Sequence, residues 1–275
     1  MWRLIQIELH KIRYNSASKI LIYVYFGLLT SIALIAAIKF DIGDIHFSLA
    51  EQGIFNFPYI WHLTTYLTAG FKFFLLLVIV SMMANEYSNR TLKQNLIDGL
   101  SKKEFVLSKF LTVILFAFVS TLFVALTTLI LGLIYSDFLE PSLIFRDLNY
   151  LLAFFVKLVG FFSFGLFLGV LIKRSAFAVG AMLVWSILEG IGSGLLHWKL
   201  EDHAENISRF FPLIAMSNLI KEPFSRIKEV KSVASKIGEE VTKDFSVHTL
   251  DILIVLFWTG LFIYGSYYLL KRRDL

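Results

Sequence analysis

The sequence predicts an all-α, polytopic membrane protein with six transmembrane helices. Of its 275 residues, 57% are hydrophobic and only 17% are charged, and its mean hydropathy is +0.72. A soluble domain is about 45–50% apolar, with about a quarter of its residues charged. One soluble core cannot absorb this excess, because it needs a charged shell around it. The composition excludes a soluble globular enzyme and a disordered chain, and we expect one transmembrane domain over residues 1–275.

Six apolar runs are long enough to cross a bilayer, since each helical crossing needs about 20 apolar residues. The predicted spans are Ile20–Ile38, Tyr66–Ala84, Phe105–Tyr135, Leu148–Ile172, Ala176–Trp198 and His248–Leu270. The third span is longer than the hydrocarbon layer requires, so we expect it to tilt or to project into water. Together the six runs predict a bundle of transmembrane helices.

The distribution of Lys and Arg predicts the orientation of this bundle. The first and third connections between spans hold Lys39 and Arg146. Fourteen basic residues lie in the N-terminal segment, the second and fourth connections and the tail: Arg3, Lys11, Arg13, Lys19, Arg90, Lys93, Lys102, Lys103, Lys109, Lys173, Arg174, Lys271, Arg272 and Arg273. Basic residues favour the cytoplasmic side and contact anionic lipid there. We therefore expect a multi-pass protein of the inner (cytoplasmic) membrane with both termini in the cytoplasm and no nucleic-acid partner.

Two segments outside the predicted spans have helical patterns of their own. Residues 1–19 are basic and predict an interfacial helix, one face of which carries Trp2, Ile5, Leu9 and Ile12. The fifth connection, residues 199–247, has eight basic and eight acidic residues, so it does not overrule the orientation. It predicts a short apolar re-entry after Phe210 and then an amphipathic helix on the extracytoplasmic surface. The apolar positions of that helix are Ile227, Val230, Val233, Ile237 and Val241.

The cytoplasmic connection over residues 85–104 has the pattern of a short, well-terminated helix. One helical face carries four apolar residues, namely Leu92, Leu96, Ile97 and Leu100. Gly99 suits the left-handed position that ends a helix. Ser101 and Glu104 have the spacing of a capping box, which predicts the start of the third long helix. This connection is therefore expected to be a rigid surface helix between two spans.

Seven residues of this region form a spaced pattern: Glu86, Thr91, Leu96, Gly99, Ser101, Lys102 and Lys109. The pattern resembles the membrane subunits of type-2 ATP-binding-cassette exporters, in particular the bacitracin-exporter-like and sodium-exporter-like permeases. The basic ending Lys271–Leu275 is similar to a terminus that is frequent in that family. The long charged fifth connection departs from the more compact members.

The resemblance implies that residues 85–104 are a coupling helix, which binds a cleft on an ATP-hydrolysing partner subunit. The contact residues that it implies are Glu86, Arg90, Thr91, Leu92, Leu96, Gly99, Ser101 and Lys102. The pathway would form between this chain and a second copy or a homologous permease. The chain has no Gly-x-x-x-x-Gly-Lys-Ser/Thr loop, so we expect ATP and Mg²⁺ on the partner and no cofactor on this chain.

Lys72, Lys157 and Glu189 fall inside the predicted spans, where a charge costs at least a few kcal/mol. Both lysines lie in the outer third of their helices, within snorkelling reach of the surface. Glu189 lies deeper, and a short carboxylate snorkels poorly. We expect Glu189 to pair with Lys157 or Lys72 inside the bundle. Such a pair either lines a translocation pathway or holds helices together.

The sequence has no recognisable catalytic or metal-binding pattern. There is no cysteine, which excludes thiolate ligands and nucleophiles, and the six His residues lack zinc-site spacing. A polar run after the fifth span is best explained by a solvated face, with a divalent-metal site as the alternative: His197, Glu201, Asp202, His203 and Glu205. We therefore expect no metal and no enzyme activity of the chain by itself.

The predicted function is that of the permease subunit of an ATP-driven exporter. The expected cargo is amphiphilic, such as a peptide antibiotic, a lipid-linked molecule or a drug. An ion-gradient-driven secondary transporter is one alternative, and it would require broken helices and ionisable groups at the midplane. A non-transporting immunity or scaffold protein is the other.

Overall fold

The computed structural model describes residues 2–36, 39–42, 45–48, 53–200, 203–226 and 244–273. In chain order the elements are α1 (Trp2–Tyr14), α2 (Ser16–Ala36), β1 (Lys39–Ile42), β2 (Ile45–Ser48), α3 (Tyr59–Ala69), α4 (Lys72–Ser88), α5 (Thr91–Ile97), α6 (Lys102–Tyr135), α7 (Pro141–Ile144), α8 (Asn149–Ile172), α9 (Ser175–Lys199), α10 (Ala204–Ser208), α11 (Pro212–Asn218), the 3₁₀ helix η2 (Phe224–Arg226) and α13 (Thr249–Arg272). The helix predicted over residues 227–241 lies outside the described residues.

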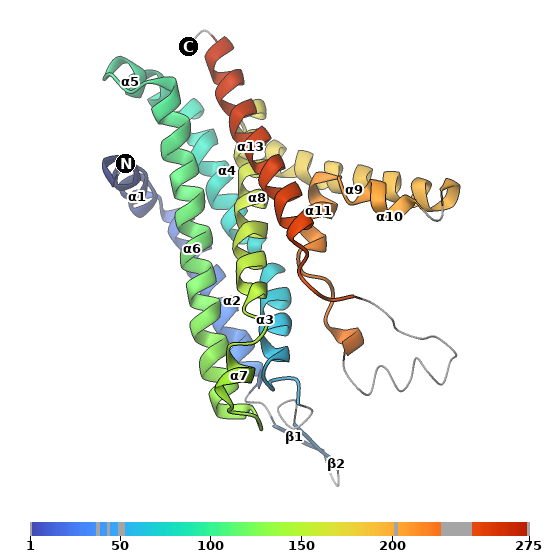
Figure 1. Cartoon of the computed structure of the whole chain (residues 1–275). Coiled ribbons are helices and arrows are strands. Elements are labelled where there is room, and N and C mark those ends of the chain that lie inside the picture. The colour runs from blue at the N-terminus through green and yellow to red at the C-terminus, as the bar shows by residue number, and fades with distance from the viewer. Residues whose placement is uncertain are drawn as a thin grey trace.

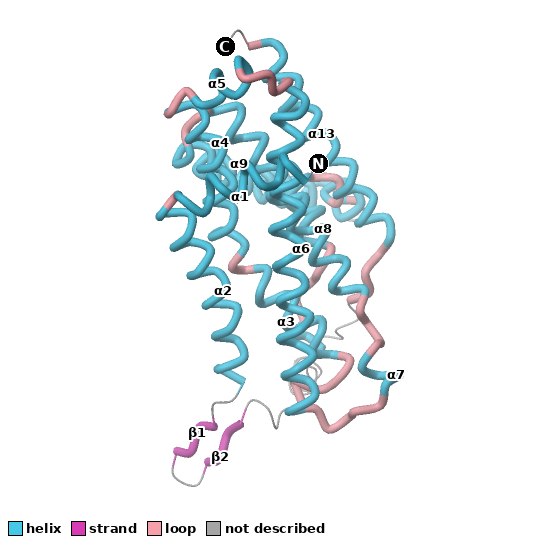
Figure 2. Tube along the Cα trace, turned by 90° about the vertical axis from the view of Figure 1, so that its left-hand side faces the viewer, coloured by secondary structure: helices cyan, strands magenta, loops and turns pink. Residues whose placement is uncertain are grey.

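The long helices form a bundle with α8 at its centre (Figure 1). α8 packs against α13, α4, α6 and α3. In the helical stretch Pro141–Ile172, which contains α8, 78% of an 18-residue apolar segment is buried. Phe154, Phe162 and Phe164 are among its side chains in the core. Both termini lie towards the end that carries α5, whereas α7 and the β1–β2 hairpin lie at the opposite end (Figures 1 and 2). We call these the α5 end and the hairpin end.

Within the described residues, α6, α8, α9 and α13 are each long and apolar enough to cross a membrane. They confirm the third to sixth predicted spans as helices, with ends within about one turn of the predicted ones. α6 begins at Lys102 rather than Phe105, because the predicted capping box between Ser101 and Glu104 forms. The first predicted span coincides with α2, whose apolar part, Ser16–Ser31, is shorter.

The second predicted span, Tyr66–Ala84, is not one straight helix. It is divided between α3 and α4, which meet at an angle of 45° and together make a fifth candidate span. At the junction, the N–H groups of Gly70 and Phe71 donate to the carbonyls of Leu67 and Thr68, three residues back, at 3.1 Å and 3.0 Å. Bonds to the third residue are those of a 3₁₀ turn, which is tighter than an α-helix, and the break lies at this turn.

Two further features differ from the prediction of a purely helical bundle. β1 and β2 form an antiparallel hairpin in which Lys39 pairs with Ser48 and Ile42 with Ile45. α9 projects sideways from the bundle instead of following its axis (Figure 1). Only 11% of an 18-residue apolar segment of α9 is buried. The other helices of this chain therefore cover little of its surface.

Candidate functional site

Four charged side chains meet beneath α5 and form what we call the charged cluster: Glu8, Lys11, Glu86 and Lys109. The Lys109 ammonium lies 2.7 Å from Glu8 Oε2 and 2.6 Å from Glu86 Oε1. Lys11 Nζ lies 2.6 Å from the same oxygen of Glu86. Glu8, Glu86 and Lys109 are buried, and Lys11 is partly exposed. The cluster joins α1, α4 and α6, which are far apart in sequence.

The sequence of α1 places Glu8 in this cluster. Leu4, Glu8 and Ile12 are its buried residues, and residues four apart lie on one face of a helix. Of the face predicted for an interfacial helix, Ile12 is buried against the bundle, whereas Trp2 is 68% exposed. The buried Lys109 attracts Glu8 and turns α1, which leaves Trp2 free for the membrane interface.

α5 is attached to the cluster through the second oxygen of Glu86. Glu86 Oε2 accepts hydrogen bonds from Thr91 Oγ1 at 2.6 Å and Asn95 Nδ2 at 3.2 Å. The turn into α5 passes through Arg90, which adopts φ 56°. Leu92 is buried beneath the helix, at 2% exposure. α5 therefore has a polar and an apolar attachment to the bundle.

The structure sorts the predicted contact residues into two groups. Glu86, Leu92 and, in part, Thr91 and Leu96 face the bundle, while Arg90, Gly99 and Ser101 are exposed. Lys102 donates a hydrogen bond to the carbonyl of Arg273 at 3.0 Å, so it also holds the C-terminal tail. Gly99 has φ 95°, as its predicted left-handed role requires. Ile97, predicted to lie on the apolar face, is 75% exposed instead.

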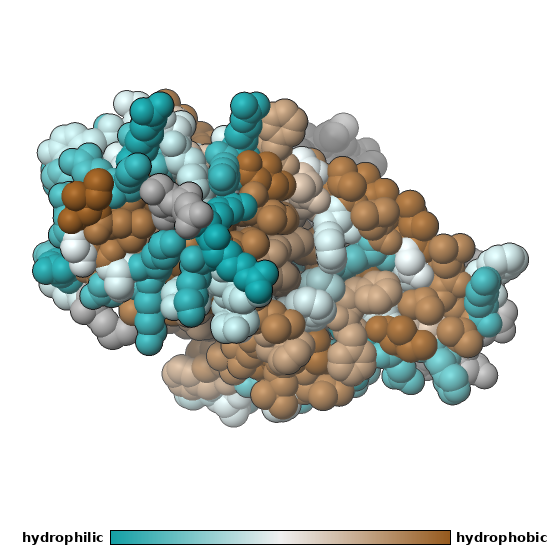
Figure 3. Space-filling model, turned by 90° about the horizontal axis from the view of Figure 1, so that it is seen from above, coloured by the Kyte–Doolittle hydropathy of each residue, from teal (hydrophilic) through white to brown (hydrophobic). Residues whose placement is uncertain are grey.

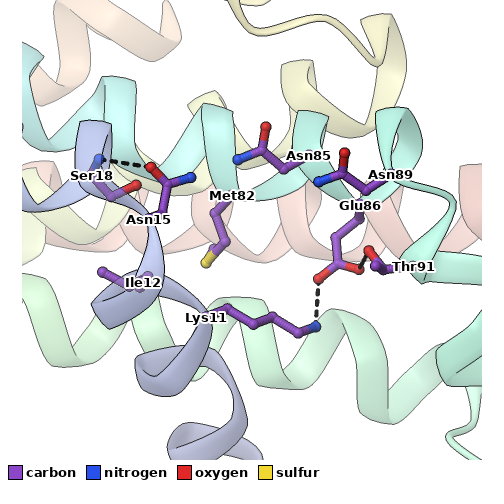
Figure 4. Close-up of a pocket in the computed structure, with 9 residues that line it drawn as sticks. All are labelled: Lys11, Ile12, Asn15, Ser18, Met82, Asn85, Glu86, Asn89 and Thr91. Carbon is purple, nitrogen blue, oxygen red and sulfur yellow. Dashed lines mark hydrogen bonds and ion pairs between the residues drawn. The ribbon is translucent and has the colours of Figure 1, made fainter.

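Two cavities flank the charged cluster. The first, of about 170 Å³, lies between α1, the start of α2 and α4. Figure 4 shows Lys11 reaching from α1 to Glu86, while the amides of Asn15, Asn85 and Asn89 stand around the space. The second, of about 250 Å³, lies on the other side of Lys11 and is bordered by the end of α5. Two cavities with polar residues in their linings therefore lie beside α5, each large enough for several water molecules.

The expected pair of Glu189 with Lys157 or Lys72 is wrong. Glu189 accepts hydrogen bonds from the backbone N–H groups of Leu213 and Ile214, at the start of α11. Lys157 donates to the carbonyl of Ser217, near the other end of α11, at 3.4 Å. Lys72 Nζ lies 4.4 Å from the ring centroid of Phe161. The positive start and negative end of a helix each attract the opposite charge, so α11 stands between the two residues.

The alternative of a metal site after the fifth span receives no support from the described residues, among which no group of three potential ligands gathers. His197 Nδ1 lies 2.8 Å from its own helix carbonyl, at Ser193. His203 precedes α10, and Glu205 lies in its first turn. Glu201 and Asp202 lie outside the described residues.

Sequence reasoning missed Glu8 as a site residue. Its signal was present, since a carboxylate stands between Leu4 and Ile12 on what becomes the buried stripe of an amphipathic helix. Such a position is unfavourable without a partner. The missing partner is Lys109, which is about a hundred residues away in the chain and which no local pattern could assign.

The chain matches a protein family of unknown function. The family model described as "Protein of unknown function (DUF2705)" matches residues 37–275. The matched region includes Glu86, Lys109 and α11, while α1 and α2 precede it. No curated protein matches the chain.

Proposed function

Since the chain belongs to the DUF2705 family of unknown function and has the apolar helices of a membrane protein, we propose a function for it from its own residues: it is the permease subunit of an ATP-binding-cassette exporter. The observation that carries this proposal is the charged cluster. It joins α1, α4 and α6 through ion pairs, and Glu86, one of its members, accepts hydrogen bonds from Thr91 and Asn95 of the short surface helix α5. That is the construction needed to pass movement from a docked partner into the membrane.

The cluster makes α5 and its supporting helices move as one body. Hydrogen bonds to a charged group contribute about 1.5–3 kcal/mol each, and α5 makes two of them to Glu86. A force on α5 is therefore passed to α4 through Glu86, and from there to α6 through Lys109. Coupling of this kind is a rigid-body transition. In the proposal, the partner binds and hydrolyses ATP with Mg²⁺, and this chain has no catalytic residue.

The exposed face of α5 is the proposed docking surface for the ATPase. Lys93, Gln94, Ile97 and Asp98 are exposed on or next to it. A large apolar side chain such as Ile97, surrounded by polar groups, is typical of a contact that a partner covers. Seen from above, hydrophilic side chains gather over this end of the molecule (Figure 3).

The proposal includes six crossings, with α2 as the first and the bent pair α3–α4 as the second. It places the α5 end in the cytoplasm, because the fourteen basic residues outside the outer connections gather at the termini and at the ends of helices on this side. The protein would then lie in the inner membrane, and α11 would face the outer half of the bilayer.

A second permease copy is part of the proposal because α9 has an unfilled surface. Ser186, Gly190 and Gly194 recur at intervals of four and are exposed. A Cβ atom added to Gly190 or Gly194 would meet nothing within 4 Å. Small residues at this spacing allow close helix–helix packing in a membrane. The expected cargo remains amphiphilic, in keeping with the apolar surfaces of the bundle.

The deciding experiment is purification of the tagged chain from its native membranes, followed by an assay of vanadate-sensitive ATP hydrolysis. The wild type should retain a subunit with a Walker motif, identified by mass spectrometry. Ile97→Asp should lose it, since it places a charge at the centre of the contact. Phe138→Asp is the matched control, because Phe138 is also exposed, at 50%, but follows the distal end of α6.

A gradient-driven transporter is the second candidate function. It is favoured by the break between α3 and α4 next to Lys72, since such transporters use discontinuous helices beside charged sites. Transport that a protonophore abolishes, by purified chain without any ATPase, would replace the first proposal with this one.

A further inference from the structure

An apolar groove of about 680 Å³ lies where α8 ends and α9 begins. α9 leaves the bundle sideways here (Figure 1), so the two helices form a corner. Ile172 borders the groove from α8, and the residues that border it from α9 are Ala176, Phe177, Gly180, Ala181 and Val184. Sites for small molecules have volumes of about 300–1,000 Å³, so the groove has room for a ligand or for part of a larger one.

The groove matches an acyl chain in length and polarity. Arg174, which precedes α9, and Val184 both line it. They are ten residues apart, which corresponds to about 15 Å along the helix at 1.5 Å per residue. The hydrocarbon layer of a bilayer is about 30 Å thick, so each leaflet provides the same length for its acyl chains.

The groove lies on a face of α9 that differs from its two other contact faces. Ala178 and Met182 are buried and face the bundle, whereas Phe177 and Val184 are 64% and 56% exposed. Gly180 of the groove and Gly190 of the proposed dimer surface are ten residues apart, which separates them by about 80° around the helix. The groove is therefore available to a further ligand when a second copy covers the small residues.

Arg174 provides the charge of the groove. Within the described part of the chain it is the only charged residue in the lining, and it is exposed. Its guanidinium carbon lies 5.9 Å from the ring centroid of Phe177, and no carboxylate of the described residues pairs with it. A guanidinium binds the oxygens of a phosphate through two parallel hydrogen bonds. The corner thus combines an apolar groove with a cation that can bind an anionic headgroup.

Two further cations lie at the end of α8, but both have contacts within the chain. Lys173 Nζ lies 5.4 Å from the ring centroid of Tyr87. Arg273 donates hydrogen bonds to the Tyr87 hydroxyl at 3.3 Å and to the carbonyl of Leu171 at 3.0 Å. They add positive charge to the corner and leave Arg174 to bind an external anion.

We propose that this corner binds one anionic phospholipid, with the phosphate on Arg174 and one acyl chain in the groove along α9. Lipid tails are as apolar as the groove, so selectivity has to come from the charge. One basic residue at the surface of an anionic membrane contributes about a fivefold preference. The site requires only that the chain lies in a membrane, so this inference goes beyond the exporter proposal and does not depend on it.

Native mass spectrometry of the detergent-solubilised full chain tests the headgroup contact. With equal amounts of phosphatidylglycerol and phosphatidylcholine, the first lipid bound to the wild type should be phosphatidylglycerol, by about fivefold. Arg174→Gln should bring this ratio close to one, and Arg174→Lys should retain part of the preference because it keeps the charge. Arg13→Gln is the matched control, since Arg13 is an exposed basic residue of α1. It should leave the ratio unchanged.

Gly180→Phe tests the acyl-chain contact. A Cβ atom added to Gly180 would meet nothing within 4 Å, so the new ring fits and occupies the groove. The variant should lose the first bound lipid of either headgroup. Gly27→Phe is the matched control, because Gly27 of α2 also has open space around it. It should bind lipid like the wild type.

An unchanged ratio in Arg174→Gln would overturn the lipid site, and so would full lipid binding by Gly180→Phe. Conversion of a dimer into a monomer by Gly180→Phe, with lipid binding unchanged, would assign the groove to a second copy instead. Equal unfolding temperatures of variant and wild type establish that each variant is folded. The exporter proposal fails on a different measurement, retention of the ATPase, so the two failures are distinguishable.

Discussion

Glu86 makes more polar contacts than Glu8, the other carboxylate of the charged cluster. One of its oxygens contacts Lys11 and Lys109, and the other accepts hydrogen bonds from Thr91 and Asn95. A buried carboxylate is stable only when its lone pairs are satisfied in this way. The four partners of Glu86 come from three helices, α1, α5 and α6, so this side chain depends on the assembly of the whole α5 end.

Lys109→Met should lower the stability of the protein by about 3–5 kcal/mol, because it leaves Glu8 and Glu86 buried without their shared cation. The measurement is thermal unfolding of the detergent-solubilised chain. Lys93→Met removes an exposed charge from α5 and should leave the unfolding temperature unchanged. Equal unfolding temperatures for the two variants would show that the cluster is dispensable.

Exchanging the charges of Glu189 and Lys157 should not restore stability. The double variant Glu189→Lys, Lys157→Glu places a cation at the start of α11 and a carboxylate at its end, against the helix dipole. We expect it to unfold at a lower temperature than either single variant. A double variant as stable as the wild type would instead indicate a direct pair between the two side chains.

For single residues, the sequence indicated which side chains belong to a site, but it was less informative about the groups that these side chains bind. Glu86, Thr91 and Lys109 belong to a local pattern, and the structure brings all three together. Glu189 and Lys157 were paired by charge alone. Their true partners are backbone groups of α11, and backbone donors and acceptors are the same in every sequence, so composition could not reveal them.

Among the elements, α5 is notable for how sharply it begins and ends. A left-handed Arg90 precedes it, a left-handed Gly99 follows it, and the Ser101 capping box starts the next helix. An isolated helix of this length is not stable in water. Its conformation therefore comes from these end signals and from its attachment to Glu86.

Gly99→Ala should lower stability by about 1–2 kcal/mol, because a left-handed backbone penalises any Cβ atom. The space around Gly99 is open, so a clash would not contribute. Gly27→Ala is the control, since Gly27 also has open space around it but lies within α2. That change should raise stability by up to about 1 kcal/mol. Opposite shifts in thermal unfolding are expected, and shifts of the same sign would refute a backbone origin.

Helical elements were predictable where a long apolar run was enough. α6, α8 and α13 follow from length and hydropathy alone. The break between α3 and α4 was not predicted, because it is a change of backbone hydrogen bonding at Gly70 and Phe71 inside an apolar run, which hydropathy does not register. The direction of α9 was not predicted either. It depends on which neighbours cover a helix, and the sequence of one helix does not contain that information.

The whole molecule is a compact bundle with one uncovered arm. Gly165 of α8 lies so close to α4 that an added Cβ would come within 2.2 Å of Leu76. α9, in contrast, exposes apolar side chains along most of its length. In a bilayer, lipid or a second copy covers such a surface, and the small-residue positions of α9 favour the second copy.

Gly190→Ile combined with Gly194→Ile should convert a dimer of the solubilised chain into a monomer, because the branched side chains hold the two helices apart. The measurement is multi-angle light scattering after size exclusion. Gly27→Ile is the control, since it adds the same side chain at another open glycine of the bundle. A dimer that survives the double change would exclude α9 as the interface.

The length of α6 has a mechanical consequence. Its 34 residues run without a break from the capping box under α5 to the hairpin end, which makes a rod of about 51 Å at 1.5 Å per residue. The hydrocarbon layer is about 30 Å thick, so both ends of the rod reach the aqueous phase. A continuous helix of this length can tilt as a rigid body. If α6 tilts by about 5° about its centre, its two ends move by about 2 Å in opposite directions. A force on the end at one side of the bilayer then displaces the end at the other side directly.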